Sequence, residues 1–83
     1  MKVQIKQPVF AETASLFVQT ANLYSETILV KKEHWVVDAK SLLGILALSL
    51  QNGDIIEFMT ESENDKLPDL TKLTELPFIE VIG

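Results

Sequence analysis

His34 and Ser41 are the side chains of this sequence best suited to chemistry, as a general base and as an acceptor hydroxyl. His34 is the only histidine, and it lies in a polar stretch expected to form a loop. Ser15 and Ser25 fall in or beside one expected helix and Ser41 opens another, so no nucleophile–base pair assembles around His34. One histidine without cysteine or clustered acids does not make a metal site. The sequence therefore predicts a protein that is not an enzyme and uses no metal or cofactor.

The charge distribution argues against nucleic acid and membranes as partners. All seven basic residues are lysines. Residues 1–53 carry five lysines and four acidic residues, whereas residues 54–83 carry two and eight, so the net charges of +1 and −6 sum to −5. Binding to nucleic acid or to anionic lipid depends on many Lys and Arg contacts to phosphate. We expect neither kind of partner.

Cysteine content and hydropathy indicate the compartment. The chain has no cysteine, which is compatible with a reducing cytosol. Its N-terminus lacks an apolar run of signal-peptide length, and the longest apolar stretch, 42–50, is too short to span a bilayer. The expectation is a soluble cytoplasmic protein.

Apolar spacing predicts alternating strands and helices within one domain, residues 1–83. Strands are expected from alternating or β-rich runs at 2–6, 27–30, 35–37 and 55–60. Helices are expected from apolar residues three or four apart at 11–23, from 42 to 48 or 49, and around 67–76. The order β-α-β-β-α-β-α suits an α+β fold in which three helices cover one face of a four-stranded antiparallel sheet.

Two segments carry a family resemblance: VFAETASLFVQTANLY, which begins at Val9, and VVDAKSLLGILALSLQNGDIIEF, which begins at Val36. They resemble the histidine-containing phosphocarrier (HPr) family of the bacterial sugar phosphotransferase system and its HPr-like, Crh-like paralogues. The resemblance extends from about residue 8 to residue 60. It implies the open-faced β-sandwich of that family, in agreement with the fold expected from periodicity.

The resemblance also implies that the phosphate-accepting site has been lost. The family signature reads roughly Leu-His-Ala-Arg-Pro-Ala-Ser, which places Phe10 on the phosphorylated histidine, Glu12 on the arginine and Thr13 on the proline. A phenyl ring cannot accept phosphate, and a carboxylate repels an incoming phosphoryl group. The expected protein is a degenerate member that is not a histidine phosphocarrier. The alternative is a phosphocarrier component that uses another residue.

Ser41 has two interpretations. The string Asp38-Ala39-Lys40-Ser41-Leu42-Leu43-Gly44 matches the segment in which HPr and Crh of Gram-positive bacteria are phosphorylated on a serine by a dedicated HPr kinase. The resemblance implies that Ser41 is this regulatory serine. The same hydroxyl suits a helix N-cap, which contributes about 1 kcal/mol to helix stability. Both a cap alone and a cap that is also phosphorylated fit the sequence.

The second helix is expected to bind protein partners. It has more apolar residues than one face of a short helix can bury, and an exposed apolar patch is a general mark of an interface. The resemblance implies that this helix and the mouth of the former active site form that surface, with a transcription regulator or a sugar-uptake component as partner. Phe10 either lies open in this surface or folds inward. The residues expected to contact the partner are Phe10, Leu42, Leu43, Leu46 and Leu50.

The C-terminus departs from the family pattern. Pro77 is expected to end the third helix, and Phe78 to Gly83 alternates too weakly to define a strand. This tail is expected either to pack as an extended segment or to pair with the sheet edge of another chain. A homodimer formed through the tail or through the second helix is a third hypothesis. The leading hypothesis is regulation of carbohydrate uptake or catabolite control through protein binding.

Overall fold

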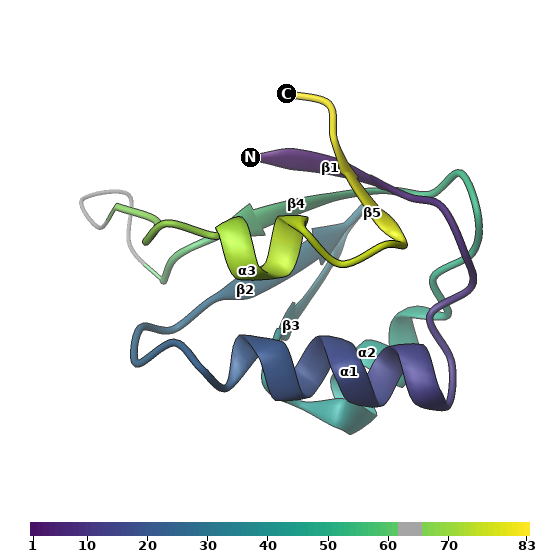
Figure 1. Cartoon of the computed structure of the whole chain (residues 1–83), viewed down its shortest axis with the longest axis horizontal. Helices are drawn as coiled ribbons and strands as arrows, with labels where there is room; N and C mark the ends of the chain where they lie inside the picture. The colour runs from purple at the N-terminus through teal and green to yellow at the C-terminus, as the bar shows by residue number, and fades with distance from the viewer. Residues whose placement is uncertain (62–65) are drawn as a thin grey trace.

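The computed structural model describes residues 1–61 and 66–83. Within these residues an antiparallel sheet has the strand order β3-β2-β4-β1-β5. Figure 1 shows α1 and α2 on one side of this sheet. The α+β prediction is confirmed, but the sheet has five strands where four were expected. The strands are β1 (Lys2–Ile5), β2 (Leu29–Lys32), β3 (Trp35–Asp38), β4 (Ile55–Met59) and β5 (Ile79–Val81).

The helices agree with the expected positions, but the third is much shorter. They are α1 (Glu12–Ala21), α2 (Leu42–Leu48) and α3 (Thr71–Thr74). The leucines that suggested a helix over 67–76 all pack into or against the core, but only one turn is helical. The Asp69 carboxylate accepts hydrogen bonds from the amide and hydroxyl of Thr71, a side-chain turn that fixes where α3 begins. None of the described helices is long and apolar enough to cross a membrane.

The core lies between the sheet and the helices because alternate strand residues point inward. Val3 and Ile5 of β1 and Ile56 and Phe58 of β4 are buried in this way. The ring of Phe17, from α1, stacks on that of Phe58 with 6.2 Å between centroids. This contact holds α1 against the middle of the sheet.

The C-terminal tail forms β5, the strand that the sequence did not predict. It pairs antiparallel with β1, placing Ile79 beside Ile5 and Val81 beside Val3. Phe78 is buried, and its carbonyl accepts a hydrogen bond from the Lys6 amide at 2.8 Å. The tail is therefore extended, as one alternative held, and it pairs with β1 of its own sheet; pairing of the tail with another chain stays a prediction. Burial of Phe78 and Ile79 and the open edge of β1 explain this outcome.

Candidate functional site

Phe10 lies exposed at the start of α1. Its side chain is 73 % exposed, so of its two expected positions the open one is correct. The Thr13 hydroxyl fixes the backbone here, because it accepts a hydrogen bond from the Phe10 amide at 2.9 Å and donates to the Pro8 carbonyl at 2.8 Å. The bonds close the segment before α1 into a tight turn. Phe10 is left outside that turn, facing solvent.

The first turn of α1 presents a carboxylate and no side-chain cap. Ala11 precedes the helix with φ 53° and ψ −114°, a conformation that residues other than glycine rarely adopt. Glu12 follows in the first turn, where its negative charge is favourable to the helix dipole. The site therefore combines an exposed phenyl ring with an anionic side chain. The phenyl ring has no nucleophilic atom that could accept a phosphoryl group.

Ser41 is the N-cap of α2, which confirms the structural part of its interpretation. Its Oγ accepts a hydrogen bond from the Gly44 amide at 3.1 Å, and its backbone is extended. Such a bond satisfies one of the amide groups that the first turn of a helix leaves unpaired. Ser41 is exposed, so the hydroxyl side of the cap faces solvent.

Three of the residues expected to contact a partner are exposed around α2. Phe10, Leu42 and Leu43, here called the α2 surface, are 73 %, 43 % and 81 % exposed. Leu46 is partly buried against the core. Leu50 is fully buried, so its expected place in the binding surface is wrong. The left-handed conformation of Ser49, with φ 51°, ends α2 and turns the chain so that Leu50 enters the core.

A backbone hydrogen bond holds the segment before α1 against the end of α2. The Val9 amide donates to the Leu50 carbonyl at 2.9 Å, and both side chains are buried. Phe10 thus follows a residue fixed at the C-terminal end of α2, whereas Leu42 and Leu43 lie in its first turn. A helix of seven residues is only about 10 Å long. The three residues of the α2 surface therefore flank the same short helix.

An ion pair anchors the C-terminal end of α2 to the sheet. The Lys32 ammonium lies 3.1 Å from the Asp54 carboxylate and donates to the Leu48 carbonyl, also at 3.1 Å. Asp54 also accepts a hydrogen bond from the Gln51 amide at 2.8 Å. The Gln51 bond, assisted by Lys32 and opposed by partial burial, lowers the pKa of Asp54 below its usual value. Sequence inspection missed this anchor because its members are far apart along the chain.

His34 takes no part in the α2 surface. It lies exposed in the turn between β2 and β3, next to Glu33, whose φ is 55°. Over the residues that the structure describes, no group of three His, Cys, Asp or Glu side chains is placed to hold a metal ion.

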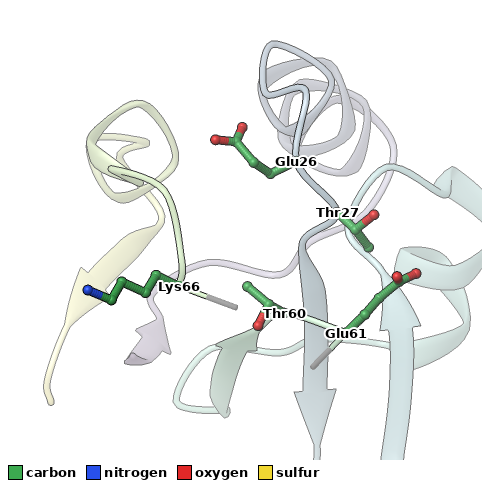
Figure 2. A pocket seen from close by; sticks show the side chains of 5 residues that line it. All are labelled: Glu26, Thr27, Thr60, Glu61 and Lys66. Carbon is green, nitrogen blue, oxygen red and sulfur yellow. The ribbon is translucent and has the colours of Figure 1, made fainter. Parts of the chain in front are cut away.

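A hollow of about 300 Å³ lies where the chain enters β2 and leaves β4. Figure 2 shows the side chains that line it, with the Lys66 ammonium directed away from the Glu26 carboxylate. Glu26 and Thr27 follow the C-terminal end of α1, so the hollow is far along the chain from Phe10. Its described lining contains no residue that the sequence singled out. The residues are Glu26, Thr27, Thr60, Glu61 and Lys66.

Comparison with known proteins gives the same family from sequence and from structure. The family described as PTS HPr component phosphorylation site matches residues 1–76. The chain belongs to the HPr family. The HPr-like protein Crh of Halalkalibacterium halodurans is 33 % identical over 66 residues, which is 80 % of this chain and 79 % of that protein. Crh of Bacillus subtilis is 29 % identical over 66 residues, or 80 % and 78 % of the two chains.

Solved HPr structures superpose on the same core. HPr-C-His from Thermoanaerobacter tengcongensis has a TM-score of 0.69 at 34 % identity, covering 78 % of this chain and 75 % of that one. The phosphocarrier HPr of Bacillus anthracis also has a TM-score of 0.69, at 35 % identity over 76 % and 77 % of the chains. The family match ends at residue 76, whereas β5 spans Ile79–Val81. The fifth strand therefore lies beyond the part matched to the HPr family.

Proposed function

We propose that this HPr-family protein binds a protein partner through the α2 surface and is not itself a histidine phosphocarrier. The observation that carries the proposal is the exposed phenyl ring of Phe10 at the start of α1, where the family resemblance places the phosphorylated histidine. Glu12 stands where an arginine would assist phosphate. In place of an anion-binding site, Phe10 offers an apolar contact and Glu12 a negative charge that repels the negatively charged phosphoryl group.

The α2 surface supports binding because its side chains have no internal partner. Leu43 leaves 81 % of its side chain in water, and Phe10 leaves 73 %. A partner that covers such a residue with apolar surface gains binding free energy of roughly 25 cal/mol for each Å² of apolar area removed from water. Large exposed apolar side chains on one part of a surface are a general mark of interaction sites. The partner we propose is a transcription regulator or a sugar-uptake component in the cytoplasm, which places the protein in carbon catabolite control.

Ser41 is the proposed control point of that surface. Its exposed hydroxyl immediately precedes Leu42 and Leu43, so a phosphate there would border the apolar contact. Phosphorylation adds about −1.5 to −2 charges and three strong acceptor oxygens. An HPr kinase is the proposed enzyme. The modified surface would present a dianion beside leucines, which a partner with basic and apolar groups can distinguish from the unmodified one.

Capture of the proposed partners by tagged variants tests this function. Wild-type protein and Ser41→Asp are expected to retain a transcription regulator or a sugar-uptake component from the native cytoplasm, to different extents. Leu43→Ser is expected to lose that protein. Leu23→Ser, which removes a 65 % exposed leucine beyond the end of α1, serves as the control and should retain it. Equal retention by Leu43→Ser and Leu23→Ser would exclude the α2 surface as the binding site.

A further inference from the structure

The outer edge of β3 is unusually apolar. Trp35 is 69 % exposed and Val36 is 49 % exposed, and β3 is the terminal strand of the described sheet. Exposed strand edges are normally protected by charged side chains, proline or bulges, because their free backbone groups can pair with another chain. Besides the exposed Asp38 at its end, this edge presents an aromatic and a β-branched residue, the types that strengthen strand pairing.

Val36 and Asp38 are the residues of β3 whose backbone groups point away from β2, and the Asp38 carbonyl already accepts the Ser41 amide at 3.0 Å. Ala39 donates its amide proton to the Ile28 carbonyl, and the β2–β3 register pairs Val30 with Val37. Hydrogen-bonded residues alternate along an antiparallel strand, so Val37 and Trp35 direct their backbone groups toward β2. Val36 therefore directs its amide and carbonyl toward the open edge. Among the described residues no strand pairs with that side of β3.

We propose that this edge pairs with the β3 edge of a second copy of the chain, antiparallel and centred on Val36. A two-fold axis at Val36 lets the two Val36 residues exchange both backbone hydrogen bonds. The register then places Trp35 opposite Val37 of the partner subunit, in the close, non-hydrogen-bonded type of pair. Aromatic and β-branched residues pair favourably there. The proposal is independent of Phe10 and Ser41, and it goes beyond the proposed function.

Charge complementarity favours a second copy as the occupant. The same register places His34 opposite Asp38 of the partner subunit, so an imidazole N–H faces a carboxylate twice across the axis. The Asp38 carboxylate also accepts the Lys40 amide at 2.8 Å, which holds it at this edge.

Packing on the helical side also suits the contact. Val37 lies beneath Gly44 of α2, where an added Cβ would be 3.1 Å from the Val37 Cβ. Trp35 is two residues from Val37 and so shares its face of the sheet. The indole is thus placed on the α2 side, where it reaches across to Val37 of the partner subunit. The absence of a side chain on Gly44 lets α2 lie directly against Val37.

Sedimentation equilibrium with two matched variants tests the proposal. Val36→Glu places two negative charges next to each other at the two-fold axis of the dimer. Within the monomer the new carboxylate lies opposite Lys31, so the stability of the monomer is not reduced. Val81→Glu is the control, because Val81 is equally exposed, at 50 %, on the opposite edge. Wild type and Val81→Glu are expected to rise from 9.3 kDa toward twice that mass between about 10 μM and about 1 mM. Val36→Glu should weaken association at least about tenfold.

The single tryptophan reports the same event. Trp35 emission is expected to move to shorter wavelengths as the wild-type concentration rises, because the indole leaves water, and to stay fixed in Val36→Glu. A wild-type protein that remains 9.3 kDa at the highest concentration would overturn the proposal. So would equal weakening by the two substitutions, or dimerisation without a change in Trp35 emission, since each places the interface elsewhere.

Discussion

Gly44 lies so close to Val37 that a Cβ added to this glycine would be 3.1 Å from the Val37 Cβ and 3.2 Å from the Ser41 Oγ. The contact brings the first turn of α2 down onto β3. It also shapes the cap, since the Gly44 amide donates to that same Oγ. The position of Ser41 and of the leucines that follow it therefore depends on the missing side chain.

Gly44→Ala is expected to destabilise the fold. Alanine is favoured over glycine in a helix by up to about 1 kcal/mol. Here the added methyl presses on a Cβ of the sheet and on the capping hydroxyl, so we expect a net loss of about 1 kcal/mol. Urea unfolding measures the change. A gain in the free energy of unfolding would show that α2 can move away from β3 without cost.

Asp54→Asn is expected to reduce stability at neutral pH but not in acid. The folded-state pKa of Asp54 is lowered, so the stability it contributes is present above the unfolded value of about 3.9 and is lost as the pH falls through the lower, folded value. Asparagine can still accept the Gln51 amide but cannot pair with the Lys32 charge. The difference in unfolding free energy between wild type and variant should shrink from pH 7 to about pH 3. A difference independent of pH would contradict this assignment.

Phe78→Ala is expected to cost about 3 kcal/mol or more, the usual range for truncating a buried phenylalanine. Phe78 is 1 % exposed and leads directly into β5. Glu80→Ala is the matched control in the same segment; its ion pair with Lys6 is 3.5 Å long and largely exposed, so little change should follow. Thermal unfolding of both variants measures this. A small effect of Phe78→Ala would mean that the fifth strand is not part of the cooperative fold.

Ser41 is expected to incorporate phosphate from an active HPr kinase. The incorporation should disappear in Ser41→Ala and persist in Ser49→Ala, which changes a serine at the other end of α2. Mass spectrometry after incubation with kinase and ATP gives the readout. An unmodified wild-type chain under conditions that phosphorylate HPr would remove the regulatory role and leave Ser41 as a cap alone.

Local patterns predicted most of the fold, and non-local contacts explain the differences. The apolar spacing within α1 and α2 was sufficient because each helix buries one stripe. β5 was missed because its three residues gain their pairing from β1, more than seventy positions away. The leucines from 67 to 76 do reach the core, but the Asp69 turn allows helix only from Thr71.

In the candidate site, too, local patterns predicted some features and contacts between distant residues decided the others. Ser41 was predicted as a cap from its place before an apolar run, and it is one. The exposure of Phe10 depends on the Thr13 hydroxyl, which holds the turn before α1. The burial of Leu50 depends on one left-handed residue, Ser49, and on the Val9 amide that meets the Leu50 carbonyl. Composition and spacing carry no signal for either contact.

Phosphate transfer from phosphoenolpyruvate tests the central claim most directly. The chain is incubated with Enzyme I and labelled phosphoenolpyruvate, with a genuine HPr in the same mixture as the positive control. We predict label on HPr and none on this chain, because Phe10 offers no acceptor and Glu12 repels the phosphoryl group. Enzyme I-dependent label on the wild-type chain would contradict the account and identify it as a phosphocarrier that uses another residue.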